Sequence, residues 1–143
     1  MKKNFLKEKN GFSLTEIVIS IAVLGFVFLG IFQSFPYALT IIESSEFGTE
    51  AAYLAQAKIE EMLQLEYDDL LVGIVEPRHH LGTVGTFLYN FERQTEVEYV
   101  DNNLNSSVID IGLKKITTTV FYTDRITNKE KSYQINILIS RLN

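Results

Sequence analysis

The stretch of sequence that decides the fold begins at Gly11 and reads GFSLTEIVISIAVLGFVFLGIF up to Phe32. No charged residue occurs between Ile17 and Ile42, and Glu16 carries the one charge in the short segment before them. A helix needs about 20 mostly apolar residues to cross a bilayer. The stretch therefore predicts a membrane-spanning helix with one carboxylate close to its start.

The charge pattern around this helix predicts its orientation. Residues 1–11 contain four Lys and one Glu, a charge of +3, so the −5 of the whole chain leaves −8 for residues 12–143. Lysines before a span, with few basic residues just after it, place the N-terminus in the cytoplasm. We expect a single-pass protein of the cytoplasmic (inner) membrane with a periplasmic or extracellular head. The acidic remainder argues against nucleic acid as a partner.

Three interpretations of the N-terminus compete. A secretory signal peptide would need small residues after its apolar part, but the nearest cleavage candidate, around Ala38, has Pro36 at the −3 place. A plain signal anchor explains the span but not Glu16. A charge near the membrane is costly and marks a functional residue by default, unless Glu16 lies at the level of the lipid headgroups.

The third interpretation comes from a resemblance. The motif GFSLTE, after a Lys-rich leader and before an apolar run, resembles the class III signal of type IV pilins and pseudopilins. In that family a membrane prepilin peptidase cuts after the Gly and methylates the new N-terminal Phe. The resemblance implies cleavage between Gly11 and Phe12, N-methylation of Phe12, and an assembly role for Glu16, the fifth mature residue, with the amine of Phe12.

The resemblance also implies an organisation and a set of partners. Residues 1–11 would be a cleaved leader, 12–38 the transmembrane and assembly helix, and 39–143 a pilin-like head that includes the second half of the helix. The implied partners are the prepilin peptidase, other pilins or pseudopilins bound through the N-terminal helix, the inner-membrane assembly platform and membrane lipid.

Physical chemistry gives a reason for such an assembly. A free amine at Phe12 and the carboxylate of Glu16 are each costly in hydrocarbon when unpaired. Within one helix, residues 12 and 16 lie on the same face. A neighbouring helix shifted along its axis can bring its carboxylate to this amine, which rewards association in one axial register.

The rest of the chain predicts an α+β head. Good helix formers from Ala51 to Gln64 carry an apolar stripe, which we expect to cover a sheet; its members are Ala52, Ala55, Ile59, Met62 and Leu63. A helix running from Phe12 to about Leu65 would be about 80 Å long. Residues 66–85 are expected to form a loop.

Alternation of apolar and polar residues predicts the strands. We expect strands at 87–100 with the odd residues inward, at 116–122 with the even residues inward, and at 133–139; residues 108–113 either begin the second strand or form a small separate edge. The fold class is therefore a long helix on a three- to four-stranded antiparallel sheet. Such a head resembles minor pilins of the V type and the I-type minor pseudopilin of type II secretion.

The chain offers little for catalysis. The absence of Cys excludes disulfides, thiolate zinc sites and a cysteine nucleophile. We expect no enzymatic activity, no cofactor and no metal, and a minor pilin or pseudopilin in a type IV pilus or a type II secretion pseudopilus. The alternative is a single-pass, membrane-anchored binding or adaptor domain of the cell envelope.

Two further clusters have possible functions. The sequence from Glu76 to His80 contains two neighbouring His, for which an exposed loop is expected rather than a metal site. The series Asp101, Asn103, Asn105 begins like an EF-hand loop, but the closing Glu is replaced by Gly112. The remaining basic residues are expected to be solvated at strand ends: Lys114, Lys115, Arg125, Lys129 and Lys131.

Overall fold

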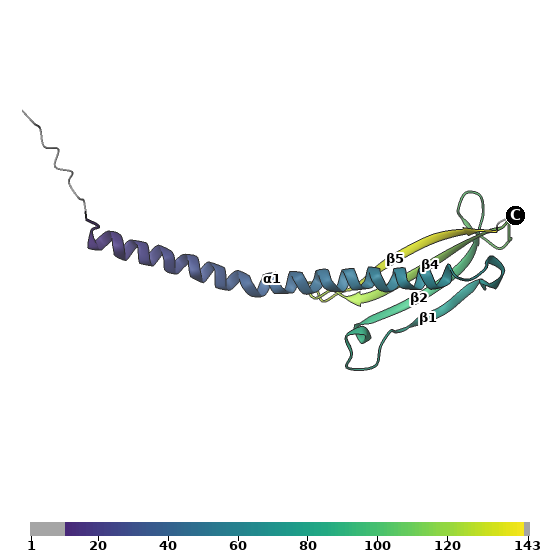
Figure 1. Cartoon of the computed structure of the whole chain (residues 1–143), viewed down its shortest axis with the longest axis horizontal. Coiled ribbons are helices and arrows are strands. Elements are labelled where there is room, and N and C mark those ends of the chain that lie inside the picture. The colour runs from purple at the N-terminus through teal and green to yellow at the C-terminus, as the bar shows by residue number, and fades with distance from the viewer. Residues whose placement is uncertain (1–10, 142–143) are drawn as a thin grey trace, which may run out of the picture. The chain divides into compact units, whose positions relative to one another are not determined.

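The computed structural model describes residues 11–141 (Figure 1). The predicted leader lies outside the described residues except for Gly11. The chain divides into two compact units, one reaching to Leu39 and the other beginning at Thr40. The first unit is helical, and the second contains the rest of the same helix and all the strands.

Helix α1 runs from Leu14 to Met62. It begins where the carbonyl of Ser13 accepts hydrogen bonds from the backbone amides of Glu16, at 3.0 Å, and Ile17, at 3.2 Å. Pro36 lies inside the helix, although its ring removes one backbone donor. The helix thus extends nearly as far as the sequence predicts and ends shortly before Leu65.

The sheet has five antiparallel strands, one or two more than expected. They are β1 (Gly73–His80), β2 (Phe91–Val100), β3 (Ser106–Ser107), β4 (Leu113–Thr123) and β5 (Glu130–Ser140). Their order is β1-β2-β4-β5, with the short β3 paired to the end of β2. Two 3-10 turns, η1 (Tyr67–Asp69) and η2 (Phe87–Asn90), lie between α1 and β2.

The expectation of a loop over residues 66–85 is wrong for β1. Its register against β2 shifts between Ile74 and Glu76 and again between Glu76 and His79. Such irregularities break the alternation by which a strand is recognised. Pro77 inside the segment also argues for a loop, but an edge strand tolerates Pro.

The other strands have the faces that alternation predicts, except at the end of β2, where the even-numbered Val100 is also fully buried. The inward positions of β2 and β4 are fully buried at Phe91, Val97, Ile116 and Val120, and Ile135 on β5 is half-buried. Strand β2 begins later than predicted, because η2 occupies the first residues of the predicted strand. The sheet thus presents one apolar face.

The second half of α1 covers this face. Its buried residues recur every three or four positions: Phe47, Ala51, Ala55, Ile59 and Met62. The small side chains of Ala51 and Ala55 pack in one cluster with Phe91 and Val120. Ile59 and Met62 pack in a second cluster with Val97 and Ile116.

The predicted stripe is therefore only partly correct. Ala55, Ile59 and Met62 are buried, but Ala52 is only half-buried and Leu63 is 48% exposed. The helix ends at Met62, so Leu63 no longer follows the helical face.

Candidate functional site

The predicted processing site lies in an extended segment just before α1. Gly11, Phe12 and Ser13 precede the helix, and Phe12 is 80% exposed. A Cβ atom added to Gly11 would meet no atom within 4 Å. The fold of the chain therefore imposes no steric requirement for Gly at this position.

Glu16 lies in the first turn of α1. Its backbone carbonyl accepts a hydrogen bond from the hydroxyl of Ser20 at 2.7 Å. Its side chain is exposed, and within residues 11–141 its carboxylate has no hydrogen-bond or ion-pair partner. The first helical unit thus carries a negative charge that the described part of the chain does not neutralise.

The structure separates Phe12 from the helical face that carries Glu16. The sequence places the two residues one turn apart on one helix, but the helix begins only at Leu14. Ser13 stands at the position of the N-cap, where its hydroxyl lies 2.6 Å from that of Thr15. Ser is a preferred residue at this position because its side-chain oxygen can accept a hydrogen bond from a backbone amide of the first turn.

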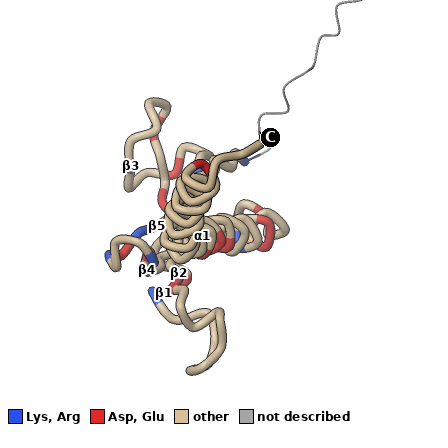
Figure 2. The backbone as a smooth tube through the Cα atoms, turned by 90° about the vertical axis from the view of Figure 1, so that its left-hand side faces the viewer, with Lys and Arg blue, Asp and Glu red and all other residues tan. Residues whose placement is uncertain are grey.

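The first unit exposes an apolar surface along its whole described length. Residues 11–39 are all exposed, including large side chains such as Phe26, at 75%, and Phe32, at 73%. The tube of α1 is tan, without charge, over most of its visible length (Figure 2). Helix α1 is long and apolar enough to cross a membrane, and such a surface is unfavourable in water. The apolar helix therefore supports anchoring in a membrane.

The comparison with known families bears on this segment. Residues 6–32 match the family model of the prokaryotic N-terminal methylation motif. The chain carries a type IV pilin-like prepilin signal. No curated protein and no solved structure matches the chain. The motif points to a structural subunit and supports a pilin-like substrate for processing.

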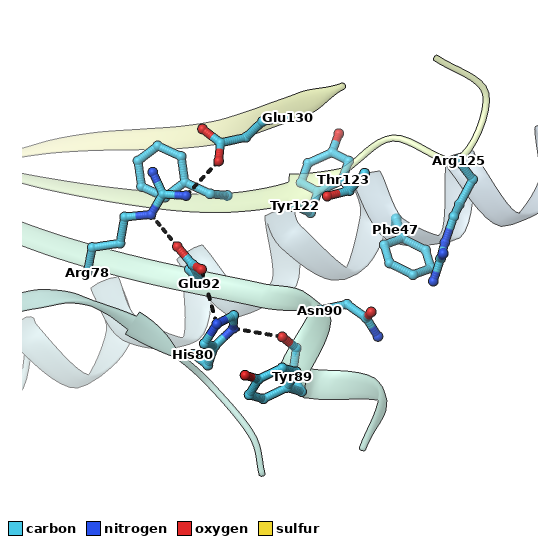
Figure 3. Close-up of a pocket in the computed structure, with 11 residues that line it drawn as sticks. Phe47, Arg78, His80, Tyr89, Asn90, Glu92, Tyr122, Thr123, Arg125 and Glu130 are labelled. Carbon is cyan, nitrogen blue, oxygen red and sulfur yellow. Dashed lines mark hydrogen bonds and ion pairs between the residues drawn. The ribbon is translucent and has the colours of Figure 1, made fainter. Parts of the chain in front are cut away.

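The head contains a pocket of about 320 Å³ between α1, the end of β1 and the start of β2 (Figure 3). Arg78 donates hydrogen bonds to Glu92 and, at 2.6 Å, to Glu130. One ring nitrogen of His80 lies 2.8 Å from the carbonyl of Tyr89, and the other lies 3.2 Å from Glu92. These contacts pair Arg78, His80 and the two carboxylates with one another and connect the end of β1 with β2 and with the start of β5.

The expected exposed loop from Glu76 to His80 is instead strand β1, and Glu76 points into the head. Its carboxylate accepts hydrogen bonds from Arg93 at 2.8 Å and from Thr95 at 2.8 Å. Burial would raise the pKa of Glu76, but the hydrogen bonds from Arg93 and Thr95 hold it below its ordinary value. In residues 11–141 no three His, Asp or Glu side chains are arranged to hold a metal ion.

The loop that resembles the start of an EF-hand uses Asp101 as a cap. One oxygen of its carboxylate accepts hydrogen bonds from the backbone amides of Asn103, at 2.8 Å, and Asn105, at 2.9 Å. The hydrogen bond from Asn105 is the largest cause of the lowered pKa of Asp101. The carboxylate of Asp101 thus stabilises the turn in which Asp101 lies.

Lys114 overturns the expectation that the basic residues are solvated. It is 4% exposed, and its ammonium donates hydrogen bonds to the carbonyls of Tyr67, at 2.6 Å, and Leu70, at 2.7 Å. The neighbouring Tyr67 hydroxyl donates to Asp110 at 2.6 Å; burial, followed by this bond, raises the pKa of Tyr67 to about 12. Lys114 is an even-numbered residue like the inward-facing Ile116, so the alternation along β4 could have predicted that Lys114 is buried.

Asp124 is a second buried charge that the sequence analysis missed. The hydroxyl of Ser44 on α1 donates to its carboxylate at 3.0 Å, and the ammonium of Lys131 also donates to it. The backbone amides of Ile126, at 2.9 Å, and Thr127, at 2.7 Å, complete the site. Asp124 therefore ties the turn between β4 and β5 to the helix, which is a structural role.

Proposed function

We propose that the chain is a minor pilin or pseudopilin. A prepilin peptidase cuts it between Gly11 and Phe12 and methylates Phe12. The mature chain is assembled into or at the tip of a type IV pilus or a type II secretion pseudopilus. The observation that carries this proposal is the coincidence of the methylation motif over residues 6–32 with an apolar helix whose described residues up to Leu39 are all exposed.

The unpaired carboxylate of Glu16 supports an assembly role. In a membrane this charge is costly, and a partner outside the described chain would remove the cost. The amine that cleavage creates at Phe12 of a neighbouring subunit has the opposite charge. Because Phe12 precedes the helix, that amine would stand at the end of the helix, accessible to a neighbour.

The head is a compact α+β unit in which most buried charges are neutralised by near neighbours. Glu76 pairs with Arg93, and Asp124 pairs with Lys131. This arrangement fits a subunit whose head serves as a rigid building block. The absence of Cys fits a minor subunit, because many major pilins close a loop with a disulfide.

The test is to follow where the full-length chain accumulates in cells that contain a pilus or pseudopilus machine and its peptidase. Wild type is expected in the sheared filament or assembled fraction. Gly11→Val, which the fold tolerates because nothing lies near a Cβ at Gly11, is expected to remain uncut in the membrane fraction. Equal assembly of both chains would contradict the proposal and favour a plain anchored domain.

A further inference from the structure

Strand β5 forms an open edge of the sheet. Within residues 11–141 it pairs only with β4, in an unbroken register from Glu130 opposite Thr123 to Ser140 opposite Leu113. Its other side presents a regular row of backbone donors and acceptors, which is a template for a further strand.

Beyond the two charged residues at its start, Glu130 and Lys131, the sequence of β5 has nothing that protects this edge. Residues 132–140 read SYQINILIS and contain no charge, Pro or Gly. Natural edge strands are usually blunted by charges, Pro or bulges. The opposite edge, β1, has these features beyond Ile74: register shifts between Ile74 and Glu76 and between Glu76 and His79, the second of which spans Pro77 and Arg78. Only the beginning of β1, around Ile74, is apolar.

The directions of the two edges restrict what can bind to β5. Each strand on the path β1-β2-β4-β5 is antiparallel to the next, so β1 and β5 run in opposite directions. In the assembly proposed above, the second halves of α1 in neighbouring copies run in the same direction. A two-fold pair of β5 strands would reverse one helix against the other, whereas β5 of one copy and β1 of the next can pair antiparallel without such a reversal.

The side chains of the two edges are complementary in this arrangement. Antiparallel pairing brings the start of β1 beside the end of β5. Ile74, 58% exposed, and Leu138, 45% exposed, then meet. Ile74 lies opposite the exposed Glu96 and Leu138 opposite Lys115 in the sheet, so both side chains are on the face away from α1.

The charged ends of the strands add nothing to this match, because Arg78 of β1 and Glu130 of β5 already pair with one another within the chain. The match between the two edges is therefore one of apolar side chains.

We propose that the β5 edge of one copy binds the beginning of β1 of a second copy, so that the sheets of neighbouring heads continue into one another. The contact is heterologous and leaves a free edge at each end, as a filament requires. The inference deepens the proposed function, on which it rests for the common orientation of the copies.

Because the chain contains no Cys, introduced cysteines can test the contact directly by disulfide formation. The full-length chain is expressed in cells whose membranes contain a prepilin peptidase. The double variant Ile74→Cys/Leu138→Cys is oxidised mildly and compared with each single variant. The matched control is Glu96→Cys/Leu138→Cys, because Glu96 is exposed on the same face one strand further inward. Opposed residues on adjacent strands are close enough for a disulfide.

The expected result is a ladder of covalent dimers, trimers and higher species from the double variant, dimers from a mixture of the two single variants, and monomers from each single variant and from the control. A double variant that stays monomeric overturns the proposal, and so does dimerisation of Leu138→Cys alone, which indicates a two-fold pair.

The N-terminal mass of the same samples separates the strand contact from the proposed processing. A processed but monomeric chain overturns only the strand contact, and an unprocessed monomeric chain contradicts both claims. A ladder from an unprocessed chain supports the contact and contradicts the processing.

Discussion

Glu16 is a charged residue in an apolar segment of helix α1. Its carboxylate has no partner in the described part of the chain. The head contains no comparable case among its buried carboxylates, because Glu76 and Asp124 both have cationic partners. We therefore propose that a contact outside the described chain pairs this charge. The motif GFSLTE selects the same residue from the sequence, and its role in assembly remains a prediction.

Glu16→Ala is therefore expected to change assembly and not the stability of the head. The variant should be inserted and cleaved like wild type but should be largely lost from the assembled fraction, which quantitative immunoblotting of membrane and filament fractions measures. Glu43→Ala, an exposed carboxylate on the same helix beyond the uncharged run, is the control and should assemble normally. Wild-type assembly of Glu16→Ala would show that the charge does not direct assembly.

Asp124 shows what a charge inside the head does. It is fully buried and accepts hydrogen bonds from Lys131, Ser44 and backbone amides. The hydrogen bond from Lys131 is the largest cause of its lowered pKa, and it outweighs the opposing effect of burial. A lowered pKa means that the folded head favours the ionised form. This stabilisation is fully present above the ordinary pKa of the carboxyl and is lost as the pH falls from there towards the lowered pKa.

The stabilisation from Asp124 should consequently disappear in acid. Wild type should exceed Asp124→Asn in unfolding free energy at neutral pH, and the difference should shrink as the pH falls below the ordinary carboxyl pKa of 3.8. Urea unfolding at a series of pH values measures the difference. Asp69→Asn is the control, since Asp69 is exposed and has no side-chain contact in residues 11–141. A difference that does not depend on pH would contradict the ionic role of Asp124.

At the scale of elements, strands and helices with a regular pattern of apolar residues could be predicted from the sequence. The places where that pattern is interrupted could not. Alternation identified β2, β4 and β5 with their inward faces because β4 pairs with β2 and with β5 in unbroken registers. Strand β1 was missed because its register shifts twice and because Glu76, its buried residue, is charged. Its burial depends on Arg93, which is distant in sequence.

The helix stripe was predicted to within a turn. Helical spacing found Ala55, Ile59 and Met62, but it missed Phe47 and Ala51 and wrongly included Leu63. Phe47 is buried by contacts with Phe91, at 5.3 Å between ring centroids, and such partners cannot be read from local spacing.

Two substitutions on this stripe distinguish the structure from the sequence pattern. Ile59→Asp should unfold the head, because a buried unpaired carboxylate costs on the order of several kcal/mol against a total stability of about 5–15 kcal/mol for a domain. Leu63→Asp, at an exposed position just after the helix, should change the melting temperature little. Thermal unfolding followed by circular dichroism measures both variants. Equal destabilisation by the two would mean that the helix does not pack on the sheet through the face seen here.

At the scale of the whole molecule, the two units require different surroundings. The unit up to Leu39 exposes apolar side chains along its described length, whereas the unit from Thr40 has its own core. A fragment of residues 39–143 is therefore expected to be soluble and to show mixed helix and strand by circular dichroism. Aggregation of this fragment without a cooperative unfolding transition would show that the head depends on the first half of α1.

The central claim concerns the covalent state of the mature chain, and the intact mass of protein purified from cells with an active prepilin peptidase tests it most directly. The account predicts a chain that has lost residues 1–11 and begins with N-methyl-Phe12, with fragment spectra that place the methyl group on the terminal amine. Gly11→Val, expressed in parallel, should keep the full mass. A wild-type chain that retains its leader, or that is cut at any other bond, would contradict the account.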